Sequence, residues 1–168
     1  MSGVDWRALG ARFPAAAHGI DLGIAGGGPM SIEAAAAGMR YYEEARDGGE
    51  RHWNDWVARA ASARASVATT LGVTPEDVAL VASASVGLTL LARLFEAPSA
   101  VLTVDRELPS VTLPFLAGGR ELRVLPLADG FGVDWDRVDP GLVAGCGLLA
   151  VSHVGFRTGH AHDLPAIG

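Results

Sequence analysis

The sequence predicts an α/β fold, a partial three-layer sandwich built on a mostly parallel sheet. Several short segments of the second half are apolar throughout, which is typical of strands that are buried on both faces. Helical segments separate these runs, and strands that alternate with helices form parallel sheets. With 168 residues, 49% of them hydrophobic, the chain is long enough to bury a core.

The first half of the chain is predicted to be helical. We expect three helices, over about residues 6–13, 32–46 and 52–71. Ser31 is a suitable N-cap for the second helix, and Thr74 with Pro75 starts a further turn. The third helix has one apolar face that we expect to be buried, formed by Trp53, Trp56, Val57, Ala60, Ala63, Val67 and Leu71.

The second half carries the expected sheet. We expect four buried strands, over residues 78–82, 100–104, 122–127 and 147–152. Helical segments are expected between them, one ending near Phe95, one over 109–117 and a short one near 135–138. For domain organisation, we expect an N-terminal segment over 1–30 and the main domain over 31–168.

Composition excludes several classes of protein. The net charge is −6 and the basic residues are scattered, so we expect no nucleic-acid partner. No apolar run is long enough to cross a bilayer and no signal-peptide layout is present, so we expect no membrane association and a cytoplasmic location. Cys146 is the single cysteine, which excludes an intrachain disulfide. All 13 basic residues are arginines, so no lysine of this chain can form a Schiff base.

The segment around Ser83, Ala84 and Ser85 joins an expected strand to a helix. Free amides and the positive end of a helix dipole at such a turn can bind a phosphate, and a serine hydroxyl adds a donor. Read alone, the segment favours an ordinary serine-capped turn. The loop "DRELPSVTLPF" also follows a strand, where open α/β sheets place ligand-binding loops, but read alone it slightly favours a plain loop in which Pro109 starts a helix.

The segment "SHVGFRTGHAHD", residues 152–163, offers the residue types of a metal site. His160, His162 and Asp163 could be ligands, with His153 as a fourth. The glycine-containing turn favours solvated or capping histidines instead. For His153, a core histidine bonded to backbone and a functional one are equally good interpretations.

Taken in order, these segments resemble the class V aminotransferase family of pyridoxal-phosphate enzymes. "SHVGFRTGHAHDLPAI" looks like the Ser-His-Val, aromatic, basic, Thr-Gly segment of kynureninase-like and isopenicillin N epimerase-like or cysteine desulfurase-like members. "DRELPSVTLPFLA" looks like the acidic-aromatic-Pro-Ser segment, and "ALVASASVGLTLLARLF" like the phosphate loop and its helix. "AGGGPMS" and the Trp-rich helix fit the opening region. The match is collinear from about residue 22 onward and implies the N-terminal portion of the large domain.

The resemblance implies a set of cofactor-binding residues, namely Ala84, Ser85, Leu108, Ser110 and Ser152. Ala84 and Ser85 would bind the phosphate of pyridoxal 5′-phosphate. Leu108 stands where the family has an aromatic residue or histidine stacked on the pyridine ring, and leucine makes only an apolar contact there. The family's pyridine-pairing aspartate, Schiff-base lysine and small C-terminal domain have no counterpart in these 168 residues.

Three functions therefore stand as alternatives. The first is a fragment or split half of a pyridoxal-phosphate enzyme that acts on an amino acid by lyase, transaminase or epimerase chemistry. Its partners would be further copies of itself or a complementing C-terminal half. The second is a non-catalytic anion-binding or regulatory remnant of that family. The third is a metal-binding domain that uses His160, His162 and Asp163.

Overall fold

The computed structural model describes residues 3–24, 26–94 and 100–167. The chain divides into two compact units, Met1–Ala79 and Leu80–Gly168, which we describe separately. The division that we predicted at residue 30 stays a prediction, and residues on both sides of it lie in the first unit. Phe95, where one predicted helix ends, and Ala25 of the "AGGGPMS" motif lie outside the described residues.

The first unit is helical, as predicted. It contains α1 (Trp6–Ala11), α2 (Ile32–Gly48) and α3 (Trp53–Leu71), with short 3₁₀ turns at Pro14–His18, Gly49–His52 and Pro75–Asp77. The Ser31 hydroxyl accepts a hydrogen bond from Ala34 N, which confirms the predicted N-cap of α2. Gly72 ends α3 in the left-handed conformation, which glycine adopts without steric cost.

One carboxylate links α2 to α3. Glu44 accepts hydrogen bonds from Trp56 Nε1 at 2.9 Å and from both terminal nitrogens of Arg59 at 2.7 and 2.8 Å. The rings of Tyr41 and Trp56 lie beside this cluster, with centroids 5.0 Å apart. These hydrogen bonds, Arg59 first and Trp56 second, lower the pKa of Glu44 from 4.5 to about 2.

The apolar face that we predicted on α3 is not buried. Trp53 is 60% exposed, Val57 51% and Leu71 65%, and Ala68 is the buried residue of the helix. Two helices in a hairpin share only one narrow seam, so they cannot cover a broad apolar stripe on either of them. Among the described residues of this unit, nothing covers this face.

The second unit contains a three-stranded sheet in which all pairs are parallel. Its strands are β1 (Ala100–Val104), β2 (Glu121–Leu125) and β3 (Cys146–Leu149), in the order β2-β1-β3. β1 has the bounds that we predicted and is buried at all five positions. The two flanking strands lie where we expected them and end earlier than predicted.

The strand predicted over 78–82 is absent, and this prediction is wrong. The segment lies outside every described strand, and Leu80 and Val81 are 47% and 45% exposed. A short apolar run shows that a segment is suited to burial, but a strand also needs a neighbour to complete its backbone hydrogen bonds. No described strand pairs with residues 78–82.

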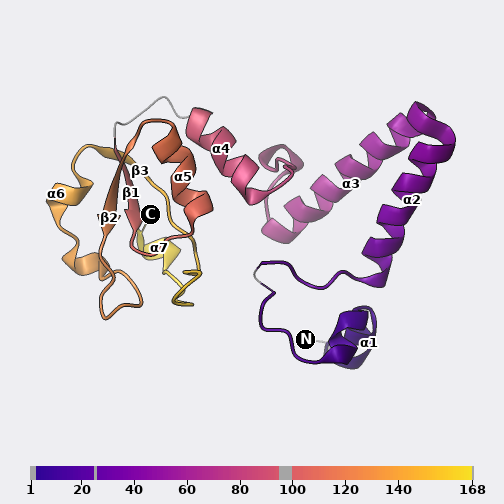
Figure 1. Ribbon diagram of the computed structural model, residues 1–168, viewed down its shortest axis with the longest axis horizontal. Coiled ribbons are helices and arrows are strands. Elements are labelled where there is room, and N and C mark those ends of the chain that lie inside the picture. The colour runs from indigo at the N-terminus through magenta and orange to yellow at the C-terminus, as the bar shows by residue number, and fades with distance from the viewer. Residues whose placement is uncertain (1–2, 25, 95–99, 168) are drawn as a thin grey trace. The chain divides into compact units, whose positions relative to one another are not determined.

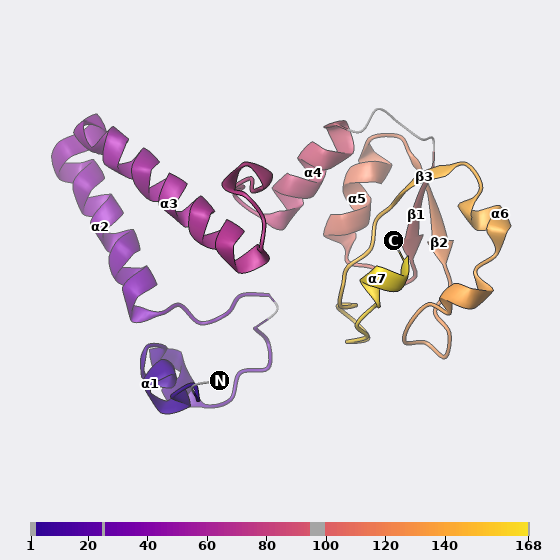
Figure 2. The same cartoon turned by 180° about the vertical axis from the view of Figure 1, so that it is seen from behind.

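Helices cover the sheet on both faces, which confirms the expected layering. On one face, Val101 and Phe115 pack with Ala92, so that α4 (Ala84–Leu94) and α5 (Pro109–Ala117) lie against the sheet. On the other, Leu125 and Val133 are packed by residues of the Trp135–Arg137 turn and of α6 (Pro140–Val143). Figure 1 shows α5 and α6 on opposite sides of the strands, and Figure 2 shows the same from behind. Among the described residues, no helix is both long and apolar enough to span a membrane.

Replacement of Leu125 tests the core of the second unit. The side chain is 0% exposed, so Leu125→Ala should lower the free energy of unfolding by about 2–5 kcal/mol through lost burial and a cavity. Its neighbour Val124 is 47% exposed, and Val124→Ala should cost less than about 1 kcal/mol. Urea unfolding of both variants measures the difference, and equal costs would contradict the assigned core.

Protonation of Glu44 should loosen the contact between α2 and α3. Because the pKa of Glu44 is lowered in the folded state, its stabilisation is complete above about pH 4.5 and is lost as the pH falls toward 2. The indole N–H resonance of Trp56 should shift over this range in the wild type. In Glu44→Gln the shift should vanish, whereas the exposed neighbour Glu43→Gln should keep it.

Candidate functional site

A groove between α4 and α5 brings two of the predicted cofactor residues together. Its volume is about 510 Å³, and Ser85 and Ser110 both line it. The other lining residues are Thr89, Ala92, Arg93, Leu113, Pro114, Ala117 and Gly118. The groove therefore has hydroxyl groups from both helices, one guanidinium and an otherwise apolar wall.

The start of α4 has the backbone geometry expected for an anion-binding turn. Ser83 caps the helix, since its hydroxyl accepts from Val86 N at 3.3 Å and its carbonyl from Gly87 N at 3.0 Å. The amides of Ala84 and Ser85 belong to the first turn, where a helix offers no acceptor of its own. In the described part of the chain, the Ser85 hydroxyl makes no hydrogen bond either. These three donors are available to a ligand.

Glu107 organises the loops that follow β1 and β3, and the sequence did not single it out. Its carboxylate accepts hydrogen bonds from Ser152 N at 2.7 Å, from Ser152 Oγ at 2.6 Å and from Leu108 N at 2.6 Å. Ser152 follows β3 and Leu108 follows β1, so this carboxylate joins the loops beyond two neighbouring parallel strands. One signal in the sequence could have identified Glu107. It is an acidic residue in a loop that connects a buried strand to a helix beginning with proline.

Leu108 is the residue that the resemblance assigns to the pyridine ring, and its contact with a cofactor stays a prediction. It is the residue directly before α5 and is 36% exposed, so its side chain remains accessible to a ligand. Its backbone amide is held by Glu107, as is Ser152. Of the five predicted residues, Ser85 and Ser110 line the groove, Leu108 and Ser152 are bound to Glu107, and Ala84 is the first residue of α4.

The histidine-rich segment forms a hairpin in which His162 is buried, and the sequence did not predict this burial. Val154 and Ala161 form an antiparallel bridge, and His162 N donates to His153 O at 2.9 Å. His162 is 4% exposed, where the sequence favoured solvated histidines. Burial first, and then the nearby His160, lowers the pKa of His162, so the neutral imidazole is favoured.

The histidines do not form a metal centre in this structure. The rings of His160 and His162 have centroids 4.9 Å apart, but His153 and Asp163 are exposed. Within residues 3–24, 26–94 and 100–167, no group of three or more His, Cys, Asp or Glu side chains is placed to hold a metal ion. A site of two imidazoles falls short of the three or four ligands that zinc sites use.

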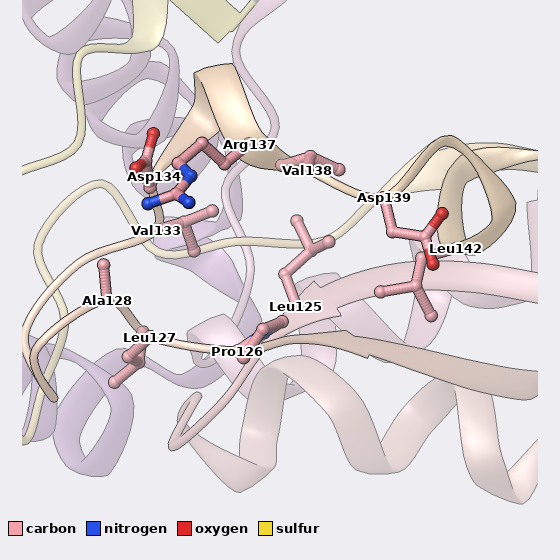
Figure 3. A pocket seen from close by; sticks show the side chains of 10 residues that line it. All are labelled: Leu125, Pro126, Leu127, Ala128, Val133, Asp134, Arg137, Val138, Asp139 and Leu142. Atoms are coloured by element: carbon pink, nitrogen blue, oxygen red, sulfur yellow. The ribbon is translucent and has the colours of Figure 1, made fainter.

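A second cavity lies on the α6 side of the sheet and contains none of the predicted residues. It has a volume of about 260 Å³ and runs between Leu125 of β2 and Leu142 of α6 (Figure 3). Of its charged residues, Asp139 accepts from Gly141 N at 2.8 Å and so caps α6. This cavity is therefore separate from the groove between α4 and α5.

Comparison of the sequence with protein-family models gave no match, and no curated protein matched it significantly. The resemblance to class V aminotransferases accordingly remains a proposal.

Replacement of Glu107 tests its role as a positioning residue. Glu107→Gln replaces one carboxylate oxygen with a donor that would face another donor, and should lower the free energy of unfolding by about 1.5–3 kcal/mol. The Ser152 amide should also exchange faster with deuterium. Asp105→Asn removes an exposed carboxylate from the same loop and should change neither quantity. Identical behaviour of the two variants would contradict the role of Glu107.

Proposed function

We propose that this chain forms the phosphate side of a pyridoxal 5′-phosphate site in a class V aminotransferase-like protein that acts on an amino acid. The reaction would be of the lyase, transaminase or epimerase type. The observation that carries the proposal is that Ser85 and Ser110, which lie in two different family-like motifs, line one groove. Both serines thus line one cavity, which supports a shared ligand.

The residues present fit the phosphate of the cofactor. Two first-turn amides and the serine hydroxyls are hydrogen-bond donors, and phosphate oxygens are acceptors only. The positive end of the α4 dipole favours a negative charge at this place. Arg93 lines the same groove from the last turn of α4, so it lies apart from these donors. These donors would bind and orient the phosphate.

The residues present do not fit the reactive end of the cofactor. Leu108 can contact the pyridine ring without stacking on it, and the sequence contains no lysine to form an imine. The lysine must then come from outside these 168 residues, in a longer chain or in a second polypeptide. We therefore assign no catalytic residue in this chain and derive no catalytic step.

The proposal extends to partners and location. The small-molecule partner is an amino acid, and the protein partner is either a further copy of the chain or a complementing C-terminal half. Exposed apolar side chains on α3 support a need for association. The proposed location is the cytoplasm, on the basis of composition and the single cysteine.

A second candidate function is a non-catalytic remnant that binds an anion. The absence of lysine favours it, because anion binding needs the amides and hydroxyls of the groove and no Schiff base. The two candidates differ in their ligand. A pyridoxal-phosphate site recognises both phosphate and ring, whereas a plain anion site recognises phosphate alone.

Calorimetric titration with pyridoxal 5′-phosphate, pyridoxal and inorganic phosphate tests both candidates. We expect reversible binding of pyridoxal 5′-phosphate that is much tighter than that of pyridoxal. Ala84→Pro with Ser85→Ala should weaken it about tenfold by removing two donors. Proline is well tolerated at the first helical position, so α4 should remain intact. Ser62→Ala, on an exposed face of α3, is the matched control.

The outcomes are distinguishable. Equal affinity for inorganic phosphate and pyridoxal 5′-phosphate would favour the anion-binding remnant. Equal affinity for pyridoxal and pyridoxal 5′-phosphate, or binding that survives the double substitution, would contradict the phosphate site.

A further inference from the structure

The C-terminal hairpin, residues 152–162, packs its histidines on a tight loop of the second unit. That loop, residues 128–135, is closed by the hydrogen bond from Ala128 N to Gly132 O at 2.6 Å. Asp129 and Gly130 both have positive φ, of 50° and 77°, which the tight reversal requires. Val133 belongs to the core under the sheet, so the loop is anchored.

Both imidazoles are in direct contact with this loop. The ring of His160 lies so close to the backbone of Gly132 that a side chain at position 132 would overlap it. The ring of His162 meets Trp135 edge to face, with centroids 5.9 Å apart and planes at 76°. His162 Nδ1 is buried and has no hydrogen-bond partner among the described residues. The imidazoles thus serve as packing groups.

The start of the hairpin is held independently. Ser152 is bound through its amide and hydroxyl to Glu107, at 2.7 and 2.6 Å. Internal hydrogen bonds, from Gly155 N to His160 O and from Gly159 N to Gly155 O, keep the hairpin folded. Loss of the histidine contacts would therefore free the His160–His162 end while the Ser152 end stays attached.

We propose that the C-terminal hairpin is a pH-operated latch, closed on the 128–135 loop while His162 is neutral and released when His162 becomes protonated. Protonation would place a positive charge on a buried ring that lies beside a second imidazole, and both conditions disfavour the charged form. The latch does not depend on the proposed cofactor.

The charged groups around His162 support this direction. His160 and His153 of the hairpin disfavour its protonation, whereas Glu107, from the loop after β1, favours it. Trp135, from the turn packed against the ring, carries no charge. Burial and the two histidines outweigh Glu107, so the pKa of His162 lies below its ordinary value of 6.5. Closure is complete above pH 6.5 and is lost as the pH falls through the lowered pKa.

Fluorine NMR of the full chain labelled with 5-fluorotryptophan tests the latch. The Trp135 resonance is assigned by its absence from Trp135→Phe. Between pH 8 and 5 it should move toward a solvent-exposed position, with a midpoint below 6.5. His162→Phe keeps an aromatic ring that cannot be protonated, and should abolish most of this transition. His18→Gln removes an exposed histidine of the other unit and should leave it unchanged.

A second variant guards against misfolding of His162→Phe. In His162→Leu the Trp135 resonance should likewise stay unchanged between pH 8 and 5. A Trp135 resonance that stays fixed while His162 titrates would overturn the latch, as would a transition that persists in both His162 variants. Neither result would bear on phosphate binding at the α4–α5 groove.

Discussion

The second unit depends on the burial of β1 on both faces and along both edges. A strand with all five residues buried needs a hydrogen-bonded neighbour on each side and a helical layer above and below. β2 and β3 pair with the two edges of β1. The helices α4, α5 and α6 cover its two faces. Parallel pairing then places the loops after β1 and β3 at the same end of the sheet. Glu107 and Ser152 meet there because of this constraint.

The sequence predicted those features that local chemistry decides. The bounds of β1 and α5 follow from a run of apolar residues and from Pro109 at a first helical position, and both were correct. The cap at Ser31 was also correct, because a serine cap acts on its own helix. Ser85 and Ser110 came from two motifs and line one groove, and their role in cofactor binding stays a prediction.

Features that depend on distant neighbours were not predictable from a single sequence. Residues 78–82 have the composition of a buried strand, yet they lack a pairing partner. The apolar face of α3 was correctly recognised as apolar and wrongly expected to be covered. Glu107 binds a residue 45 positions away, and no periodicity reports such a contact. His162 is buried and packs against Trp135, and the residues around His162 in the sequence do not predict this contact.

Under the proposed function, two features of the chain would call for additional polypeptide. One is chemical, since the proposed cofactor site would have no lysine of this chain to form an imine. The other is physical, since β3 is an edge strand whose Leu148 and Leu149 are only partly buried. An apolar edge strand is a ready place for another strand to pair. If additional polypeptide supplies the lysine, pairing of one of its strands with β3 would also cover this edge. A single association would then remedy both deficits, whereas a plain anion-binding remnant would leave the edge of β3 without a role.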